Sequence, residues 1–249
     1  MTQILCITGA TSGIGRATAE RFAAEGWRVI AAGRREDRLR ELAAAYAGKV
    51  LPLVLDVRDR KAVDLAFASL PPDFAAIDVL CNNAGLALGL EPAQDCNPDD
   101  WDAMIDTNIK GLAYCTRAIT PGMAARGRGH VINVGSIAGS YAYPGGNVYG
   151  GTKAFVEQFS RNLRCDLHGT GVRVTNVEPG LLETEFSIVR FKGDAAAAAA
   201  VYQGADPLRA QDIADVIWWA ATRPAHVNIC RVEVMPTCQS NSALRVHKG

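Results

Sequence analysis

Near its start the chain reads Ile4-Leu5-Cys6-Ile7-Thr8-Gly9-Ala10-Thr11-Ser12-Gly13-Ile14-Gly15, an apolar run that leads into a turn rich in glycine. An alanine-rich segment with helical character, residues 16–25, follows it directly. Glycines permit a sharp turn and a close approach of the backbone to a ligand, and a helix N-terminus favours a pyrophosphate. The spacing is Gly-x-x-x-Gly-x-Gly, not the Gly-x-Gly-x-x-Gly of the general dinucleotide motif. The stretch predicts a strand, a turn and a helix that bind a nucleotide, although a strand-to-helix connection without a ligand also fits it.

From there onward, strand-like runs alternate with helix-like runs. Further strands are expected at residues 28–33, 50–55, 77–82, 130–135, 172–178 and 228–235. Helices are expected between them, at residues 36–47, 60–69, 99–126, 148–168 and 209–222. This alternation predicts an α/β protein whose parallel sheet is covered by helices on both faces.

Length and composition indicate one enzyme-sized domain. The 249 residues contain no Pro/Ser-rich linker, and 49% of them are hydrophobic, so we expect a single domain over residues 1–249. Lys plus Arg and Asp plus Glu number 26 each, so no overall charge attracts nucleic acid or an anionic membrane, and neither is expected as a partner. Without a secretory signal or a long apolar span, a cytoplasmic location is expected.

The cysteines and histidines predict neither disulfides nor a metal site. The 7 Cys are odd in number and lack a Cys-x-x-Cys pair, which is typical of reduced thiols, and the 4 His are dispersed.

Tyr149 and Lys153 are four residues apart in a segment expected to be helical, which sets a phenol and an ammonium on one face. A phenol has an ordinary pKa of about 10, so it becomes a useful acid or base near neutrality only when its anion is stabilised, as a nearby lysine can do. The pair therefore predicts proton transfer. Taken alone, it also fits an amphipathic helix with a solvated lysine.

Other polar residues and turns follow the carboxyl ends of the expected strands, where parallel sheets bind their ligands. They are Gly33-Arg34, Asp56-Val57, Asn82-Asn83-Ala84-Gly85, Gly135-Ser136 and Glu178-Pro179-Gly180. Each alone fits an ordinary turn, but their joint placement predicts a binding site along one edge of the sheet.

In their order along the chain, these motifs resemble the short-chain dehydrogenase/reductase family, and the resemblance covers essentially the whole chain. The matching features are Thr8 to Gly15, Asp56-Val57, Asn82 to Gly85, Asn108, Ser136, Tyr149-x-x-x-Lys153 and Pro179-Gly180. The resemblance implies a single Rossmann-type doubly wound domain with a parallel seven-stranded sheet, and a homotetramer.

The resemblance also implies four catalytic residues. Tyr149 is the general acid in carbonyl reduction and the base in the reverse reaction, and Ser136 holds the substrate oxygen. Lys153 lowers the pKa of Tyr149 and contacts the nicotinamide ribose. Asn108 forms a kink that supports a proton path to Lys153. From the residues alone, Ser136 also fits a helix cap, and Asn108 a backbone hydrogen bond within its helix.

For the cofactor, the resemblance implies contacts with Gly9, Ala10, Thr11, Ser12, Gly13, Ile14, Gly15, Arg34, Arg35, Asp56, Val57, Asn83, Tyr149, Lys153, Pro179 and Gly180. An acidic side chain at the end of the second strand would repel a 2′-phosphate, but Gly33 stands there, followed by Arg34 and Arg35. NADP is therefore favoured, because arginine binds phosphate through parallel charged hydrogen bonds. The alternative is a solvated helix start formed by Arg34, Arg35, Arg38 and Arg40. Ser12, where relatives carry a second basic residue, indicates a less strict preference.

Several stretches, among them 189–194 and 224–229, are similar to the NADP-dependent 3-hydroxy acid dehydrogenases. That subgroup acts on serine, allo-threonine and related acids and reduces malonic semialdehyde; a similarity to sulfoacetaldehyde reductases is also present. All these substrates are small anions. A lid is expected at about residues 181–206. Within it, Arg190 or Lys192 either contacts the substrate anion or is a surface charge. We expect Ser136, Tyr149 and Arg190 to bind substrate.

The sequence therefore predicts an NADP-dependent oxidoreductase that interconverts short 3-hydroxy acids and the matching semialdehyde or ketone. A sulfoacetaldehyde or other small carbonyl reductase is the alternative. A non-catalytic NADP-sensing module is a more distant one, because it would need none of Ser136, Tyr149 and Lys153.

Overall fold

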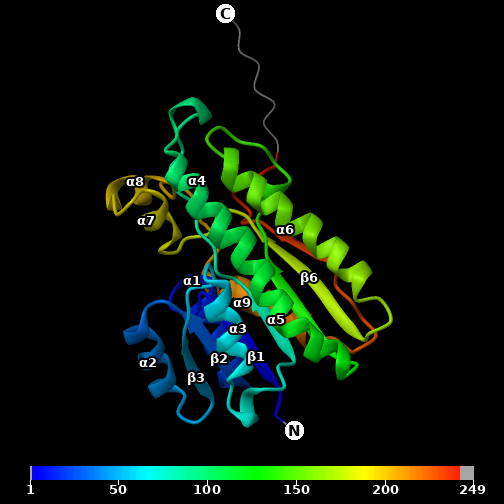
Figure 1. Ribbon diagram of the computed structural model, residues 1–249. Coiled ribbons are helices and arrows are strands. Elements are labelled where there is room, and N and C mark those ends of the chain that lie inside the picture. The colour runs from blue at the N-terminus through cyan, green and yellow to red at the C-terminus, as the bar shows by residue number, and fades with distance from the viewer. Residues whose placement is uncertain (1, 242–249) are drawn as a thin grey trace, which may run out of the picture.

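One parallel sheet of seven strands forms the centre of the molecule in the computed structural model, which describes residues 2–241 (Figure 1). The strand order is β3-β2-β1-β4-β5-β6-β7, and every neighbouring pair is parallel. The strands are β1 (Ile4–Thr8), β2 (Arg28–Gly33), β3 (Val50–Val54), β4 (Val79–Asn82), β5 (Gly129–Val134), β6 (Val172–Pro179) and β7 (Arg231–Val234). The predicted fold class is confirmed.

Helices cover both faces of this sheet. The α-helices in the described residues are α1 (Gly13–Ala24), α2 (Glu36–Ala45), α3 (Arg60–Ala68), α4 (Pro98–Ile105), α5 (Leu112–Ala125), α6 (Asn147–Asp166), α7 (Phe186–Arg190), α8 (Ala195–Ala200) and α9 (Ala210–Ala221). Helices α1, α2 and α9 pack on one face, while α3, α5 and α6 pack on the other (Figure 1). No helix in the described part of the chain is both long and apolar enough to cross a membrane.

The alternation of side chains along β1 explains the two layers. Leu5 and Ile7 point to the face where Phe22 of α1 is buried, and Cys6 points to the opposite face, against Met123 of α5. All five side chains are fully buried. Burying a side chain as large as that of Phe22 stabilises the fold by about 1.5–3 kcal/mol, so both faces of the strand must be covered.

The crevice for a ligand follows from the strand order. β1 pairs with β2 on one side and with β4 on the other, so the chain changes direction across the sheet at this point. The loops after these strands therefore diverge at their carboxyl ends and leave a crevice between them.

The helix predicted at 99–126 differs from the structure. It is divided into α4 and α5 by a π-helical segment, η3 (Asp106–Gly111). Wider turns of this kind are uncommon and occur often at functional sites. The apolar periodicity of the sequence continues through the segment and does not indicate the interruption, but the segment contains Asn108, where the family resemblance implies a kink.

Candidate active site

A cleft of about 360 Å³ opens at the carboxyl edge of the sheet, between the loop after β1 and segment 181–206. Most of the predicted site residues line it: Gly9, Thr11, Ser12, Gly13, Ile14, Arg34, Arg35, Asp56, Val57, Asn83, Ser136, Tyr149, Lys153, Pro179 and Gly180. Four predicted residues, Ala10, Gly15, Asn108 and Arg190, lie outside its lining. Residues from six strand ends and from helices α1 and α6 thus meet in one place.

The glycine-rich loop leaves donors at the start of α1. Gly9 and Gly13 have φ angles of 71° and 50°, in the left-handed region that favours glycine. A Cβ on Gly15 would lie 2.2 Å from the carbonyl oxygen of Gly9, so glycine is needed where α1 packs against the loop. Ser12, at the N-cap, makes no side-chain cap to the helix. The first N–H groups of α1 therefore lack the usual side-chain acceptor, which fits the pyrophosphate of a dinucleotide.

Asn83 fixes this loop from the neighbouring strand. Its Nδ2 donates to the carbonyl oxygen of Thr8 at 2.9 Å, while its backbone N–H donates to the Thr8 hydroxyl at 3.1 Å. Asp56 has an exposed partner of its own, since Arg58 Nη2 donates to Asp56 Oδ2 at 2.6 Å. Hydrogen bonds from Arg58 lower the pKa of the Asp56 carboxyl.

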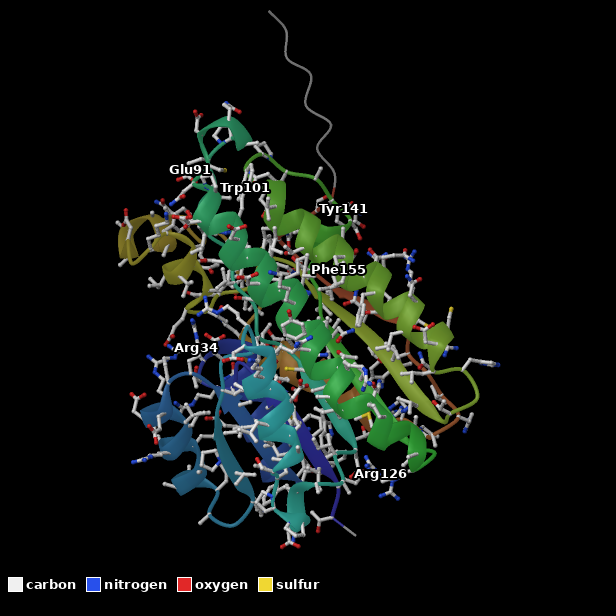
Figure 2. The ribbon with its side chains drawn as sticks, viewed as in Figure 1. Arg34, Glu91, Trp101, Arg126, Tyr141 and Phe155 are labelled. Carbon is white, nitrogen blue, oxygen red and sulfur yellow. The ribbon has the colours of Figure 1, made fainter. Side chains whose placement is uncertain are left out.

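The arginines after β2 differ in their surroundings. Arg34 lies exposed above α2 (Figure 2), and Arg40 pairs with Glu36 on the outer face of that helix. Arg35 turns toward the cleft instead, where its Nε donates to Thr11 Oγ1 at 2.9 Å and its Nη2 donates to Ser12 Oγ at 2.7 Å. Arg40 thus belongs to a solvated helix start, whereas Arg35 is hydrogen-bonded to the glycine-rich loop.

The predicted proton-transfer residues lie together. Tyr149 and Lys153 occupy one face of α6, with Lys153 Nζ 5.8 Å from the centre of the Tyr149 ring. Lys153 Nζ donates to the carbonyl oxygen of Val134 at 2.8 Å, at the end of β5. Ser136 follows the same strand, and its side chain acts to lower the pKa of Tyr149. The Ser136 hydroxyl also accepts a hydrogen bond from the N–H of Ala138 at 3.1 Å. The same side chain therefore caps the following helical turn and faces the site.

Burial controls the acidity of this pair. It raises the pKa of Tyr149 to about 12, although the Ser136 hydrogen bond and the Arg190 charge lower it. It also lowers the pKa of Lys153 to about 8. A phenol with this pKa is protonated near neutrality and can serve as an acid. That Lys153 lowers the pKa of Tyr149 stays a prediction.

Asn108 lies in the π-helical segment and links three elements. Its Nδ2 donates to the carbonyl oxygen of Leu86 at 2.8 Å and to Thr152 Oγ1 at 3.0 Å, and its Oδ1 accepts from Leu86 N–H at 2.9 Å. The side chain therefore bonds outside its own helix. It holds the loop after β4 against α6 one residue from Lys153.

Arg190 is the cation of segment 181–206 nearest to the phenol. Its guanidinium lies 5.1 Å from the centre of the Tyr149 ring and 5.4 Å from that of Phe186. Its Nη2 donates to the hydroxyl of Tyr143 at 3.0 Å, while its Nε is buried without a hydrogen-bond partner in the described structure. Lys192 instead pairs with Asp100 of α4 at 2.7 Å. Of the two predicted cations, Arg190 is thus the one beside Tyr149.

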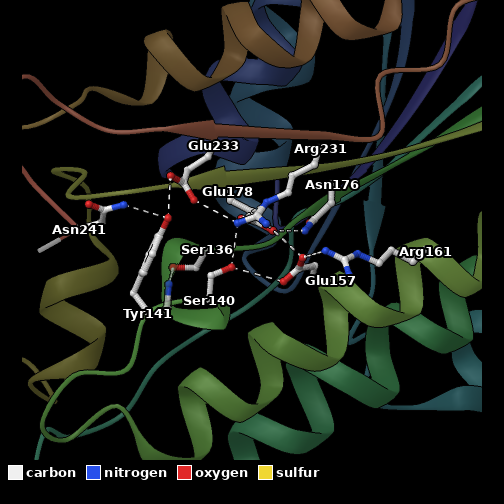
Figure 3. A network of polar contacts seen from close by, with 11 residues as sticks. Ser136, Ser140, Tyr141, Glu157, Arg161, Asn176, Glu178, Arg231, Glu233 and Asn241 are labelled. Carbon is white, nitrogen blue, oxygen red and sulfur yellow. Dashed lines mark hydrogen bonds and ion pairs between the residues drawn. The ribbon is translucent and has the colours of Figure 1, made fainter.

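A charged network lies behind Ser136 (Figure 3). Arg231 of β7 contacts Glu178 at 2.7 Å and Glu157 of α6 at 3.3 Å, and also donates to the hydroxyl of Ser140. Glu178 is 1% exposed, and burial raises its pKa to about 7 against the pull of Arg231. The network ties β6, β7 and α6 to the turn that carries Ser136.

Two residues that hold the arginines near the site are not indicated by any sequence motif. Tyr143 fixes Arg190, and Glu185 accepts hydrogen bonds from Arg35 and Arg38. Neither belongs to a spaced motif, and only the contact between distant segments reveals them. In the part of the chain that the structure describes, no group of three or more His, Cys, Asp or Glu residues is arranged to hold a metal ion.

Comparisons with known proteins agree with this geometry. The family model for short chain dehydrogenases matches residues 3–194. The NADP-dependent 3-hydroxy acid dehydrogenase YdfG of Salmonella typhi is 57% identical over 247 residues, which cover 99% of this chain and 100% of that protein. Sulfoacetaldehyde reductase 2 of Chromohalobacter salexigens is 55% identical, with 100% of both chains covered. A solved closed form of serine dehydrogenase complexed with NADP+ superposes with a TM-score of 0.98 at 54% identity, covering 99% of this chain and 100% of that one. Fold, cleft and matches together show that the chain belongs to the short-chain dehydrogenase family.

Proposed function

We propose that this protein is an NADP(H)-dependent oxidoreductase that interconverts short 3-hydroxy acids and the matching semialdehyde or ketone. The position of Arg190 carries the proposal, because it brings a guanidinium with an unpartnered, buried Nε beside the phenol of Tyr149. A short 3-hydroxy acid has a carboxylate near its reacting hydroxyl, so one substrate would meet both groups once segment 181–206 brings Arg190 to the cleft. The names of the similar 3-hydroxy acid dehydrogenase and serine dehydrogenase support this substrate class.

The chain's own residues hold the cofactor in this proposal. The N–H groups at the start of α1 bind the pyrophosphate, and Arg34 and Arg35 bind the 2′-phosphate. The remaining contacts come from Gly9, Ala10, Thr11, Ser12, Gly13, Ile14, Gly15, Asp56, Val57, Asn83, Tyr149, Lys153, Pro179 and Gly180. When bound, the nicotinamide supplies the hydride chemistry. The NADP+ complex of the similar serine dehydrogenase supports the choice of NADP.

Proton transfer falls to Tyr149. In reduction, its hydroxyl donates a proton to the substrate oxygen, which Ser136 holds through a hydrogen bond. In oxidation, the phenolate accepts that proton, so the charged form of Lys153 must stabilise it. Asn108 supports the proton path to Lys153. Its hydrogen bond with Thr152, the neighbour of Lys153 on α6, favours this role.

Segment 181–206 is proposed to act as a lid over the substrate. Its α7 carries Arg190, and the Gly89 N–H donates to the carbonyl oxygen of Arg190 at 3.0 Å, which connects the segment to the loop after β4. Closure of such a segment excludes water and brings the cation to the anion.

A sulfoacetaldehyde reductase is the second candidate, favoured by the 55% identity to a protein of that name. A sulfonate is an anion of similar reach, so Arg190 suits either group. We further propose a cytoplasmic homotetramer. The half-buried pair Phe155 and Phe159, stacked on α6 with ring centres 5.6 Å apart, provides an apolar surface for such an assembly. Light scattering on the purified protein tests the oligomeric state.

Product analysis tests the proposed reaction. Purified protein incubated with NADP+ and 3-hydroxypropionate is expected to form malonic semialdehyde and NADPH in equal amounts, observed by NMR and absorbance. The Tyr149→Phe variant serves as the control that should form neither. Oxidation of isethionate without oxidation of 3-hydroxypropionate would favour the sulfonate candidate instead.

A further inference from the structure

Glu185, directly before α7, joins segment 181–206 to the arginines after β2. Its Oε2 accepts from Arg35 Nη1 at 2.9 Å, and its Oε1 accepts from Arg38 Nη1 at 2.7 Å. The hydrogen bond from Arg35 and that from Arg38 lower the pKa of the Glu185 carboxyl. A single carboxylate therefore lies between two guanidinium groups on the rim of the cleft.

Both arginines are partly exposed, but each is also held by the glycine-rich loop. Arg35 donates to the hydroxyls of Thr11 and Ser12, and Arg38 Nη1 approaches the carbonyl oxygen of Thr11 at 3.3 Å. Two fixed guanidinium groups that converge on one anion are well suited to a phosphate. Here the anion that they bind is a side chain from a distant segment.

We propose that Glu185 competes with the 2′-phosphate of the cofactor for these arginines and so determines how strongly the protein distinguishes NADP from NAD. The inference rests on the proposed binding of the 2′-phosphate by Arg35. Carboxylate and phosphate carry the same sign of charge and need the same N–H donors, so each weakens the binding of the other. NAD lacks this phosphate and leaves the pairs of Glu185 with Arg35 and Arg38 intact. Glu185 thus reduces the preference for NADP that the arginines provide.

Binding of nucleotide fragments tests the proposal without catalysis. Calorimetric titration would compare 2′,5′-ADP, which has the 2′-phosphate, with 5′-ADP, which lacks it. Glu185→Gln removes the charge and keeps the shape, so its affinity for 2′,5′-ADP should rise about tenfold, equivalent to about 1.4 kcal/mol. Its affinity for 5′-ADP should change less than about twofold.

The matched control is Glu183→Gln, the same change two residues earlier, at a carboxylate that pairs with Arg209 and does not line the cleft. This control should bind both fragments as the unmodified protein does. Unchanged or weaker binding of 2′,5′-ADP by Glu185→Gln overturns the proposal, and so does an equal rise in the Glu183→Gln control.

The Arg35→Gln variant tests the proposed contact between Arg35 and the 2′-phosphate separately from the competition by Glu185. Weaker binding of 2′,5′-ADP by Arg35→Gln together with no effect of Glu185→Gln would leave the phosphate role of Arg35 standing and refute the competition by Glu185. Unchanged binding of 2′,5′-ADP by Arg35→Gln would instead refute the proposed cofactor contact, and the competition with it.

Discussion

Arg190→Gln tests the anion site of the proposed enzyme. Arg190 lies over the Tyr149 ring at 5.1 Å, and its Nε is buried without a partner in the described structure, so a carboxylate there would gain a charged hydrogen bond. Such a bond contributes about 1.5–3 kcal/mol. Its loss should lower kcat/KM for 3-hydroxypropionate by about 10-fold to about 150-fold.

A neutral substrate separates this contact from other effects of the substitution. Because the Arg190 charge also lowers the pKa of Tyr149, Arg190→Gln should slow every substrate to some degree. The amide 3-hydroxypropionamide has nearly the same shape as 3-hydroxypropionate and carries no charge. The decisive quantity is therefore the ratio of kcat/KM for the acid to that for the amide. This ratio should fall by about 10-fold to about 150-fold, as expected for the lost charged hydrogen bond.

Lys192→Gln is the matched control, because it removes the same charge from the same segment, whereas Lys192 pairs with Asp100 and is 57% exposed. It should leave the ratio unchanged, as NADPH absorbance with both substrates would reveal. An equal loss for acid and amide in Arg190→Gln would refute the anion contact and assign Arg190 to lid closure alone.

Three further predictions follow from the site. Tyr149→Phe should lower kcat at least about 10²–10⁴-fold and leave the NADPH dissociation constant nearly unchanged in a fluorescence titration; turnover at the ordinary rate would contradict the role of the phenol. Neutralising Arg34 and Arg35 together should weaken NADP(H) by about 1.5–3 kcal/mol for each charged hydrogen bond lost and barely affect NAD(H), whereas equal losses for both cofactors in calorimetry would contradict the assignment. Folding raises the pKa of Glu178 from 4.5 to about 7, so its contribution to stability falls as pH rises through that interval; Glu178→Gln should flatten the dependence of Tm on pH there, and parallel curves would speak against it.

The sequence predicts the sheet well because its signals are local. Strand β2 begins and ends where the apolar run of residues 28–33 does, and the glycine-rich turn after β1 needs only its own residues to be recognised. The Tyr149 and Lys153 pair is likewise fixed by one helix. Motifs that depend on spacing within one element can therefore be recognised from the amino-acid sequence alone.

The sequence does not reveal contacts between distant segments. Neither spacing nor composition distinguishes Arg190 from Lys192, since the choice depends on Tyr143 and on Asp100 of α4. The sequence also allows Arg38 to be part of a solvated helix start, and only the structure shows its hydrogen bond with Glu185 of a distant segment. The apolar periodicity likewise does not reveal the π-helical segment around Asn108, where only the family resemblance implies a kink, and the hydrogen bonds of Asn108 with Leu86 and Thr152 join it to distant segments.

The proposed reaction is the oxidation of short 3-hydroxy acids with NADP+. The most direct test measures kcat/KM of the purified protein for L-serine, L-allo-threonine, 3-hydroxypropionate and isethionate, each with NADP+ and with NAD+, by the absorbance of the reduced cofactor. We expect the highest values for the 3-hydroxy carboxylic acids with NADP+. A higher value for isethionate than for every carboxylic acid, or the absence of cofactor reduction with all four substrates, would contradict the proposed function.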